Sequence, residues 1–329
     1  MVPRRLAIAL LAWVASSAWA APPAVVWPRP LAVGDTIGVV APAGPVRSRA
    51  LLDRGLQRLR ERGYRVRLGA NLMADNGLTA GSEAQRAADL NSLWRDESVQ
   101  AIWCAKGGYG TLALLDLLDW ETIARRPLPV IGYSDVTGLQ MALCARTGLV
   151  SLHGPMVADQ LGLGGSLDAG TLSSLFGWLG GLPLPHAPTN PSGAPLRVVR
   201  AGQASGRLIG GNLSLLAALC GSAYLPDPTG AILVLEDVNE YPYRIARMLD
   251  TLKLAGVLDK VGGVVIGSFT DCFEGSGLAF SDLLLPRLGN RAIPVLAGLN
   301  FGHVASRATL PLGANASLDS AKAALTIMP

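Results

Sequence analysis

The feature that most constrains the fold is an alternation of short apolar runs with longer amphipathic segments in the first half of the 329-residue chain. Short apolar runs that end at turns are typical of buried strands, and leucines at helical spacing are typical of helices. Strands that alternate with helices form a parallel sheet with helices on both faces. The predicted strands span 35–40, 65–68, 101–105 and 129–133, and the predicted helices span 48–63, 82–94, 111–118 and 134–146.

The second half also mixes both kinds of element. Its last 20 residues alternate weakly, as in a closing hairpin. The pattern predicts strands over 231–235, 263–269 and 294–299, a helix over 243–254, and a Gly-Gly-Asn turn with a helix in 206–220.

The length predicts two domains, at about 100–200 residues per domain. We expect an N-terminal parallel-sheet α/β domain over 31–174 and a C-terminal mixed α/β domain over 196–329. A Gly- and Pro-rich stretch over 175–195 is nearly free of charge and is the predicted connection. Working groups should lie at the carboxyl ends of the strands.

Residues 1–20 are predicted to be a secretory signal peptide. Arg4 and Arg5 precede an apolar run over 6–15, and alanines stand at both cleavage-site positions. The run is too short to span the ~30 Å hydrocarbon core of a bilayer. We therefore expect cleavage before Ala21, export to the periplasm and no stable membrane anchor, whether by general or by twin-arginine export.

The charge balance argues against a nucleic-acid partner. Two of the 28 Lys and Arg residues lie in the leader, which leaves 26 against 24 Asp and Glu, and no basic stripe with interleaved aromatic residues is present. With three histidines and no cysteine pair at metal-ligand spacing, we expect neither a metal nor a cofactor. Three of the four cysteines lie in apolar segments typical of buried thiols, so we expect no disulfide.

Ser134 is the first candidate nucleophile. A predicted strand runs into Ile131-Gly-Tyr-Ser-Asp135, and a helix begins directly after it. This is the arrangement of a nucleophile elbow, which lifts a hydroxyl off the sheet edge and aims backbone N–H groups at the same point. The second glycine of that motif is missing, and a serine at this place also suits a helix N-cap.

Glu236 and the three histidines are the groups able to activate such a nucleophile. Glu236 ends an apolar strand, where a carboxylate can orient a histidine. His186 lies in the Pro-rich connection, and His153 follows an apolar segment, as a structural histidine does. His303 follows a strand in Gly-rich surroundings that let a side chain approach a substrate closely.

The segment Lys106-Gly-Gly-Tyr-Gly110 follows a predicted strand and precedes a helix. Such a loop presents backbone N–H groups to an anion or an oxyanion. It lacks the G-x-G-x-x-G spacing of a dinucleotide-binding loop, so we exclude that function for it.

Together these segments resemble the LD-carboxypeptidase family of serine peptidases, which includes muramoyl-tetrapeptide carboxypeptidases and microcin C self-immunity hydrolases. The resemblance covers about residues 31 to 313, and its strength lies in the common order of many short stretches. They are Gly34–Ala43, Ala101–Gly110, Ile131–Asp135, His153–Pro155, Gly210–Leu213, Leu233–Asp237, Tyr243-Arg244, Gly302-His303 and Leu310–Gly313.

The family uses a Ser–Glu–His triad, so the resemblance implies that Ser134 is the nucleophile, Glu236 the orienting acid and His303 the base. Glu240 is the competing acid, but it lies past the predicted strand end. The resemblance also implies an oxyanion hole and a set of substrate contacts. The expected oxyanion-hole residues are Gly107, Gly108 and Asp135, and the expected substrate contacts are Lys106, Tyr109, Asn212 and Arg244.

Three features depart from the family pattern. The glycine loop begins with Lys106 where the family usually has arginine, so bidentate binding of a carboxylate is lost. Ala246 stands where the family often has an aspartate before the next arginine, so a local ion pair is expected to be missing. The export signal is the third, because many relatives act in the cytoplasm.

The resemblance implies a homodimeric enzyme that removes the terminal D-Ala from a murein tetrapeptide without a cofactor. One alternative is an amide hydrolase of peptidyl or acyl-sulfamoyl adenylates, for which Trp178, expected near a lid over the cleft, is the candidate adenine platform. The other is a non-catalytic periplasmic binding protein, which would keep two α/β domains and a cleft without a triad.

Overall fold

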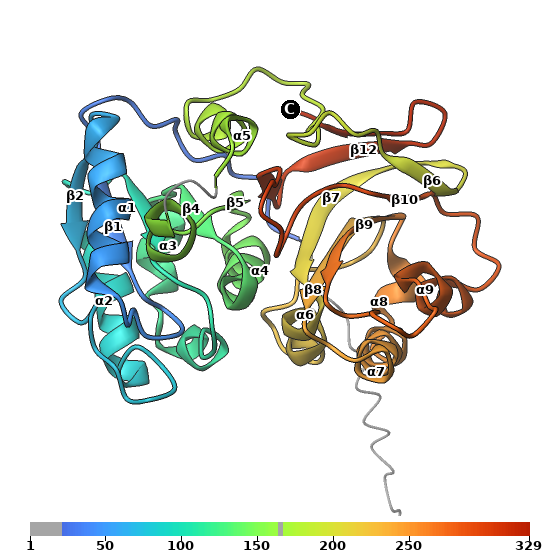
Figure 1. Cartoon of the computed structure of the whole chain (residues 1–329), viewed down its shortest axis with the longest axis horizontal. Coiled ribbons are helices and arrows are strands. Elements are labelled where there is room, and N and C mark those ends of the chain that lie inside the picture. Colours follow the sequence, from blue (N-terminus) through green and yellow to red (C-terminus); the bar gives the residue numbers. More distant parts are fainter. Residues whose placement is uncertain (1–21, 164–166) are drawn as a thin grey trace, which may run out of the picture.

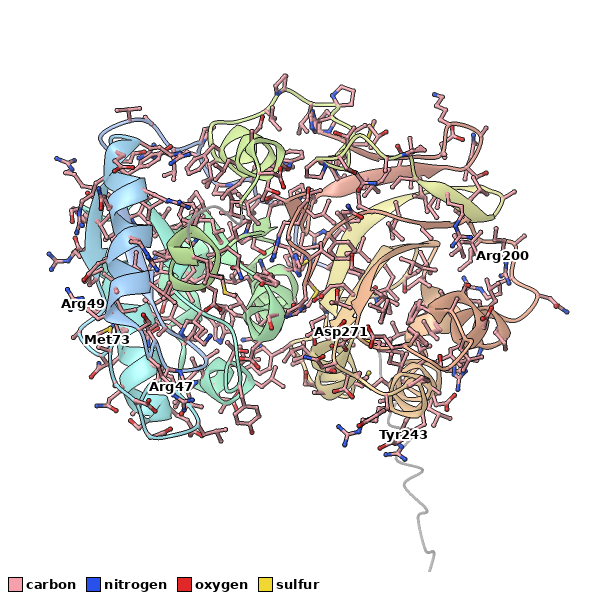
Figure 2. All side chains as sticks on the ribbon, in the orientation of Figure 1. Arg47, Arg49, Met73, Arg200, Tyr243 and Asp271 are labelled. Carbon is pink, nitrogen blue, oxygen red and sulfur yellow. The ribbon has the colours of Figure 1, made fainter. Side chains whose placement is uncertain are left out.

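The computed structural model describes residues 22–163 and 167–329. Two α/β halves lie side by side, each built around its own sheet, and side chains fill the space between them (Figures 1 and 2). The predicted signal peptide, 1–20, lies outside the described residues. No helix within the described ranges has both the length and the apolar character needed to cross a membrane.

The first sheet has six strands in the order β11-β5-β4-β3-β1-β2. Its first five strands along the chain pair in parallel, which confirms the expected parallel sheet. β11 pairs antiparallel to β5, although it comes from the predicted C-terminal domain. The strands are β1 (Thr36–Val40), β2 (Arg65–Leu68), β3 (Ala101–Cys104), β4 (Val130–Gly132), β5 (Ser151–His153) and β11 (Leu310–Leu312).

The helices of this half follow from local sequence signals. The Ser48 side chain caps α1, whose apolar face is buried, and Ser82 and Gln85 form the capping box of α2. The predicted connection over 175–195 begins inside α5. The elements are α1 (Arg49–Glu61), α2 (Glu83–Arg95), η1 (Leu112–Leu117), α3 (Trp120–Arg125), η2 (Ser134–Val136), α4 (Thr137–Thr147), η3 (Val157–Leu161) and α5 (Ala169–Leu179).

The second sheet has seven strands in the order β13-β12-β7-β8-β9-β10-β6. β7 to β10 pair in parallel, whereas β6, β12 and β13 pair antiparallel, so this half is mixed α/β as expected. The strands are β6 (Arg197–Arg200), β7 (Gln203–Asn212), β8 (Ile232–Val238), β9 (Gly263–Thr270), β10 (Val295–Ala297), β12 (Asn315–Asp319) and β13 (Ala324–Ile327). The helices are α6 (Leu213–Leu219), α7 (Pro242–Leu254), α8 (Val257–Lys260) and α9 (Phe280–Leu288).

The Gly-Gly-Asn segment was expected to be a turn, and this expectation is wrong: it is the end of β7. Gly210 and Gly211 both have positive φ, near 129° and 120°. A Cβ added at Gly210 would lie 2.0 Å from the carbonyl oxygen of Val234 on the next strand. Glycine is therefore required here for two backbones to approach, and it disguises the strand in the sequence.

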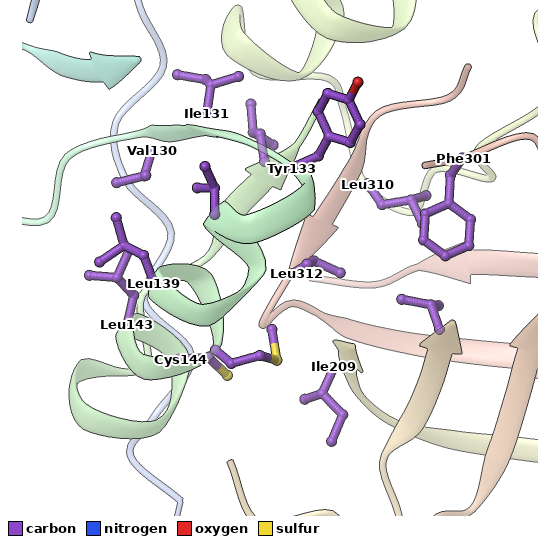
Figure 3. Close-up of a cluster of buried hydrophobic side chains, with 14 of the residues drawn as sticks. Val130, Ile131, Tyr133, Leu139, Leu143, Cys144, Ile209, Phe301, Leu310 and Leu312 are labelled. Carbon is purple, nitrogen blue, oxygen red and sulfur yellow. The ribbon is translucent and has the colours of Figure 1, made fainter. Parts of the chain in front are cut away.

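Helix α4 joins the two halves. Figure 3 shows Leu139 and Leu143 of this helix in a buried cluster that also includes Leu312 of β11 and Ile209 of β7. At the end of β7, the Asn212 N–H donates to Thr137 Oγ1 at 3.2 Å. The helix that follows the candidate nucleophile thus packs directly against the second sheet.

Candidate active site

Ser134 lies at the carboxyl end of β4, in a short 3₁₀ turn that leads into α4. Its φ is +64°, in the left-handed region that non-glycine residues seldom adopt. Backbone strain of this kind persists only where the surrounding structure enforces it, and it is the conformation of a nucleophile elbow. An ordinary N-cap residue has extended backbone, so this φ separates the two interpretations of Ser134.

A hydrogen-bonded chain links this serine to the second sheet. His303 Nε2 lies 2.9 Å from Ser134 Oγ, and His303 Nδ1 lies 2.7 Å from Glu236 Oε2. Glu236 stands in β8 and is fully buried, and Thr270 Oγ1 donates to the His303 carbonyl at 2.8 Å. The structure therefore brings together the three residues that the sequence proposed as nucleophile, acid and base.

Gly302 permits the close approach of His303 to the carboxylate. Its φ is +95°, and a Cβ there would lie 2.3 Å from Glu236 Oε2. Any side chain at this position would displace the carboxylate or the loop that carries the histidine.

The glycine loop packs against the nucleophile. A Cβ added at Gly107 would lie 3.0 Å from Ser134 Cβ and 3.2 Å from its Oγ. Gly108 has φ of +116°. Within 22–163 and 167–329, the N–H groups of Gly107 and Gly108 donate to no acceptor of the protein, so they are free to bind a substrate oxygen.

Buried side chains hold this loop in place. Asp135 Oδ2 accepts from the Thr111 N–H at 2.8 Å, and burial raises the pKa of the Asp135 carboxyl. Arg86 donates through Nη1 to the Pro42 carbonyl at 2.6 Å and to the Gly110 carbonyl at 2.8 Å. The Asp135 side chain thus fixes the loop relative to the nucleophile, which leaves only its backbone N–H for the predicted oxyanion hole.

A second histidine lies behind the acid. His153 Nε2 is 3.9 Å from Glu236 Oε1, and both atoms are buried without a hydrogen-bond partner among the described residues. Burial is the main cause that lowers the pKa of His153 to about 3, with His303 and Arg307 adding to the shift. His153 is therefore neutral at neutral pH and offers no charge to Glu236.

The predicted substrate contacts have different surroundings. Lys106 Nζ is paired with Asp159 Oδ1 at 2.9 Å, and the Tyr109 side chain is exposed. Arg244 is also exposed, lies 3.7 Å from Glu240 and donates through Nε to the Tyr243 hydroxyl at 3.3 Å. Tyr243 lies at the outer edge of the molecule in Figure 2.

Asn212, the fourth predicted contact, is a helix cap. Its side chain accepts from the Leu215 N–H and donates to Asp237 Oδ1 at 2.9 Å. Both ends of the amide are therefore already bound within the protein.

Sequence reasoning missed several residues around the triad. The Tyr133 ring lies 4.9 Å from the His303 ring, and Gln160 Nε2 donates to the Tyr133 hydroxyl at 2.7 Å. The Arg307 guanidinium stands 4.8 Å above the same ring. Tyr133 was visible in the motif before the nucleophile, but nothing in the local sequence pointed to Gln160 or Arg307.

The described cysteines are all free, and burial raises the pKa of Cys144 to about 11. The described residues contain no group of three or more His, Cys, Asp and Glu side chains arranged to hold a metal ion. A serine, a histidine and a carboxylate in one hydrogen-bonded chain form the arrangement found in serine hydrolases.

The two halves match, in order along the chain, the two domain models of one family. Residues 37–154 match the LD-carboxypeptidase N-terminal domain, and residues 205–318 match the LD-carboxypeptidase C-terminal domain. The chain belongs to the LD-carboxypeptidase family, and it is a peptidase. This assignment removes the alternative of a non-catalytic binding protein.

Named relatives support the same family. The chain is 35% identical over 300 residues to the probable murein peptide carboxypeptidase of Bacillus subtilis, covering 90% of this chain and 92% of that one. It is 36% identical over 306 residues to the murein tetrapeptide carboxypeptidase of Pseudomonas aeruginosa, covering 87% and 94%. A solved structure of the microcin C7 self-immunity protein MccF with aspartyl sulfamoyl adenosine has a TM-score of 0.83 at 29% identity, covering 92% and 98%. The family thus supports either a murein peptide carboxypeptidase or an activity of the MccF type.

Proposed function

We propose that the protein is a serine-type LD-carboxypeptidase that removes the terminal D-Ala from a murein tetrapeptide. The observation that carries this proposal is the continuous hydrogen-bonded chain from Ser134 through His303 to Glu236 on the LD-carboxypeptidase fold. The scissile bond joins the L-centre of a diamino acid to the terminal D-Ala.

The geometry supports nucleophilic catalysis. His303 Nε2 takes the proton of Ser134 as Oγ attacks the scissile carbonyl carbon, and it then donates that proton to the leaving amine. Water hydrolyses the resulting ester on Ser134 by the same route in reverse. Glu236 accepts from His303 Nδ1–H, which fixes the tautomer and stabilises the imidazolium that forms in each step.

The oxyanion of the tetrahedral intermediate needs N–H donors beside the nucleophile. Gly107 packs against Ser134, Gly108 follows Gly107 in the same loop, and the Asp135 N–H follows Ser134 in the chain. Each donor of this kind contributes about 10²–10³ in rate.

The alternative substrate, an acyl-sulfamoyl adenylate, needs a surface on which to stack adenine. The lid position expected for Trp178 is wrong, because this residue stacks on Trp27 at 6.2 Å and lines a cavity of about 270 Å³ with Pro129 and Val150. Those two residues precede β4 and β5, whereas Ser134 follows β4. The cavity thus lies at the amino ends of the strands, away from the triad.

The test compares two substrates with one enzyme preparation. We expect kcat/KM on the murein tetrapeptide to exceed that on aspartyl sulfamoyl adenosine by at least about 10²-fold, the selectivity expected from a site built for one ligand. A preference of the same size for the adenylate would overturn the proposed substrate while leaving the serine mechanism intact.

We also propose that the enzyme is exported to the periplasm and acts as a homodimer. The leader composition supports export. The proposed substrate supports it separately, because tetrapeptides occur in the periplasm and a mature enzyme there would meet them directly. Cell fractionation and light scattering of the purified mature protein test the two points separately. Full-length protein confined to the cytoplasm would contradict the first, and a monomeric mass at micromolar concentration would contradict the second.

A further inference from the structure

Arg307 is a buried cation without an acidic partner. The residue is only 6% exposed, and its Nε and Nη1 are buried with no hydrogen-bond partner among the described residues. No carboxylate oxygen of the described residues lies within 4.0 Å of its guanidinium nitrogens. The remaining segments, 1–21 and 164–166, contain no Asp or Glu, so the chain has no acid there that could supply the missing partner.

The side chain that Arg307 contacts and hydrogen-bonds, Tyr133, is neutral, and the carboxylates of Asp159 and Glu236 act on the same tyrosine without forming an ion pair with Arg307. Arg307 Cζ stands 4.8 Å above the Tyr133 ring, and its own backbone N–H donates to Thr171 Oγ1 at 2.9 Å. Gln160 binds the Tyr133 hydroxyl, and His153 is uncharged at neutral pH. Attraction to an aromatic face offsets only a fraction of the desolvation of a buried charge, so these neighbours leave the guanidinium under-compensated.

The place of Arg307 relates this unmet charge to the active site. Arg307 follows His303 in the same loop, and Tyr133 directly precedes Ser134. The Tyr133 ring contacts both loop residues: its centre lies 4.9 Å from that of the His303 ring and 4.8 Å from Arg307 Cζ. Arg307 and His303 therefore contact the same ring, which places the unpaired guanidinium beside the triad.

We propose that Arg307 binds the free α-carboxylate of the terminal residue and so makes the enzyme a carboxypeptidase. This inference rests on the proposed function and names the group that senses the chain end. A carboxylate fits because it is planar and anionic and accepts several N–H donors of a guanidinium at once. A buried site strengthens the pair, because water screens it less.

The two other cations that the sequence proposed as substrate contacts are less suited to this role. Lys106 is already neutralised by Asp159 and is 37% exposed at its side chain. Arg244 lies beside Glu240 and is 54% exposed. Solvent screening weakens both, and a substrate carboxylate would have to compete with their present partners.

The test measures kcat/KM on a tetrapeptide with a free terminal carboxylate and on its C-terminal amide. In the wild type we expect the acid to be preferred by about 30- to 5000-fold, the range for a buried charge pair that loses one partner. Arg307→Met should lose most of this preference, because kcat/KM on the acid should fall while kcat/KM on the amide changes by less than about threefold. Arg307→Lys keeps the charge but not the planar fork, so its preference should lie between those of the wild type and Arg307→Met.

Thermal unfolding separates this role from a structural one. Removal of an unpaired buried charge should leave the melting temperature of Arg307→Met equal to or above that of the wild type. Lys106→Met and Arg244→Met are the matched competitors, and both should keep the acid-to-amide ratio. If Arg307→Met keeps the ratio, or if Lys106→Met or Arg244→Met loses it instead, the inference is wrong although the proposed function stands. Failure of the wild type to cleave the tetrapeptide would instead refute the proposed function.

Discussion

The two sheets hold their parts of the site by different means. On the first sheet, the backbone positions Ser134, through its φ of +64° and the close packing of Gly107 against it. On the side of the second sheet, side-chain hydrogen bonds position Glu236 of β8 and His303 of the loop that follows β10. The proposed nucleophile therefore belongs to one sheet alone, whereas its proposed activation depends on how the two sheets are placed relative to each other.

Removal of either reacting group should have the largest effect. Ser134→Ala and His303→Ala should each lower kcat by about 10⁴–10⁶-fold, and the double variant should be little worse than either, because nucleophile and base act as a unit. Steady-state kinetics on the tetrapeptide measure this. A fold-loss of kcat in the double variant equal to the product of the two single losses would show that Ser134 and His303 contribute independently.

A methyl group at Gly302 should disturb the positioning of Glu236 and His303 and leave Ser134 in place. Its Cβ would lie 2.3 Å from Glu236 Oε2, and a displacement of about 1 Å can cost about 10²-fold in rate. Gly298→Ala is the matched control, since Gly298 has a similar φ of +90° and nothing nearer than 3.8 Å to an added Cβ. We expect both variants to lose stability from backbone strain, and only Gly302→Ala to lose kcat by about 10²-fold. Equal losses of kcat in Gly302→Ala and Gly298→Ala would show that the contact with Glu236 has no special role in catalysis.

His153 should affect stability at acid pH. Its folded pKa of about 3 lies below the unfolded value of 6.5, so the unfolded chain binds more protons between these pH values. Its contribution to the free energy of unfolding is therefore complete above pH 6.5 and falls as the pH drops toward 3, by at most about 1.4 kcal/mol per pH unit. Urea unfolding across this range should show a shallower loss in His153→Gln. An unchanged slope would mean that His153 is not held neutral by burial.

Local sequence located the strand that leads into Ser134, because an apolar run that stops at a polar residue marks the end of a buried strand. The same rule placed the end of the second strand too early: Glu236 was expected to follow a strand over 231–235, but β8 continues to Val238, and Glu236 is a buried residue inside it. The choice of His303 over His153 came from family resemblance, because spacing along the chain does not reveal which side chains meet. His303 reaches Ser134 across 169 residues of sequence.

Long-range packing explains what the sequence did not predict. β11 crosses to the first sheet by pairing with β5, and no local signal specifies such a partner. β7 was hidden because its glycines serve a close backbone approach. Arg307 was missed because arginine in a loop is usually exposed to solvent, and the sequence does not show that this one is buried.

The release of D-Ala from a murein tetrapeptide tests the central claim most directly. Mass spectrometry of the digest should show, with purified mature wild-type enzyme, a tripeptide and free D-Ala as the only products. Ser134→Ala at the same concentration should leave the tetrapeptide intact over the same time. An uncut tetrapeptide with the wild type, or equal release of D-Ala by Ser134→Ala, would contradict the account.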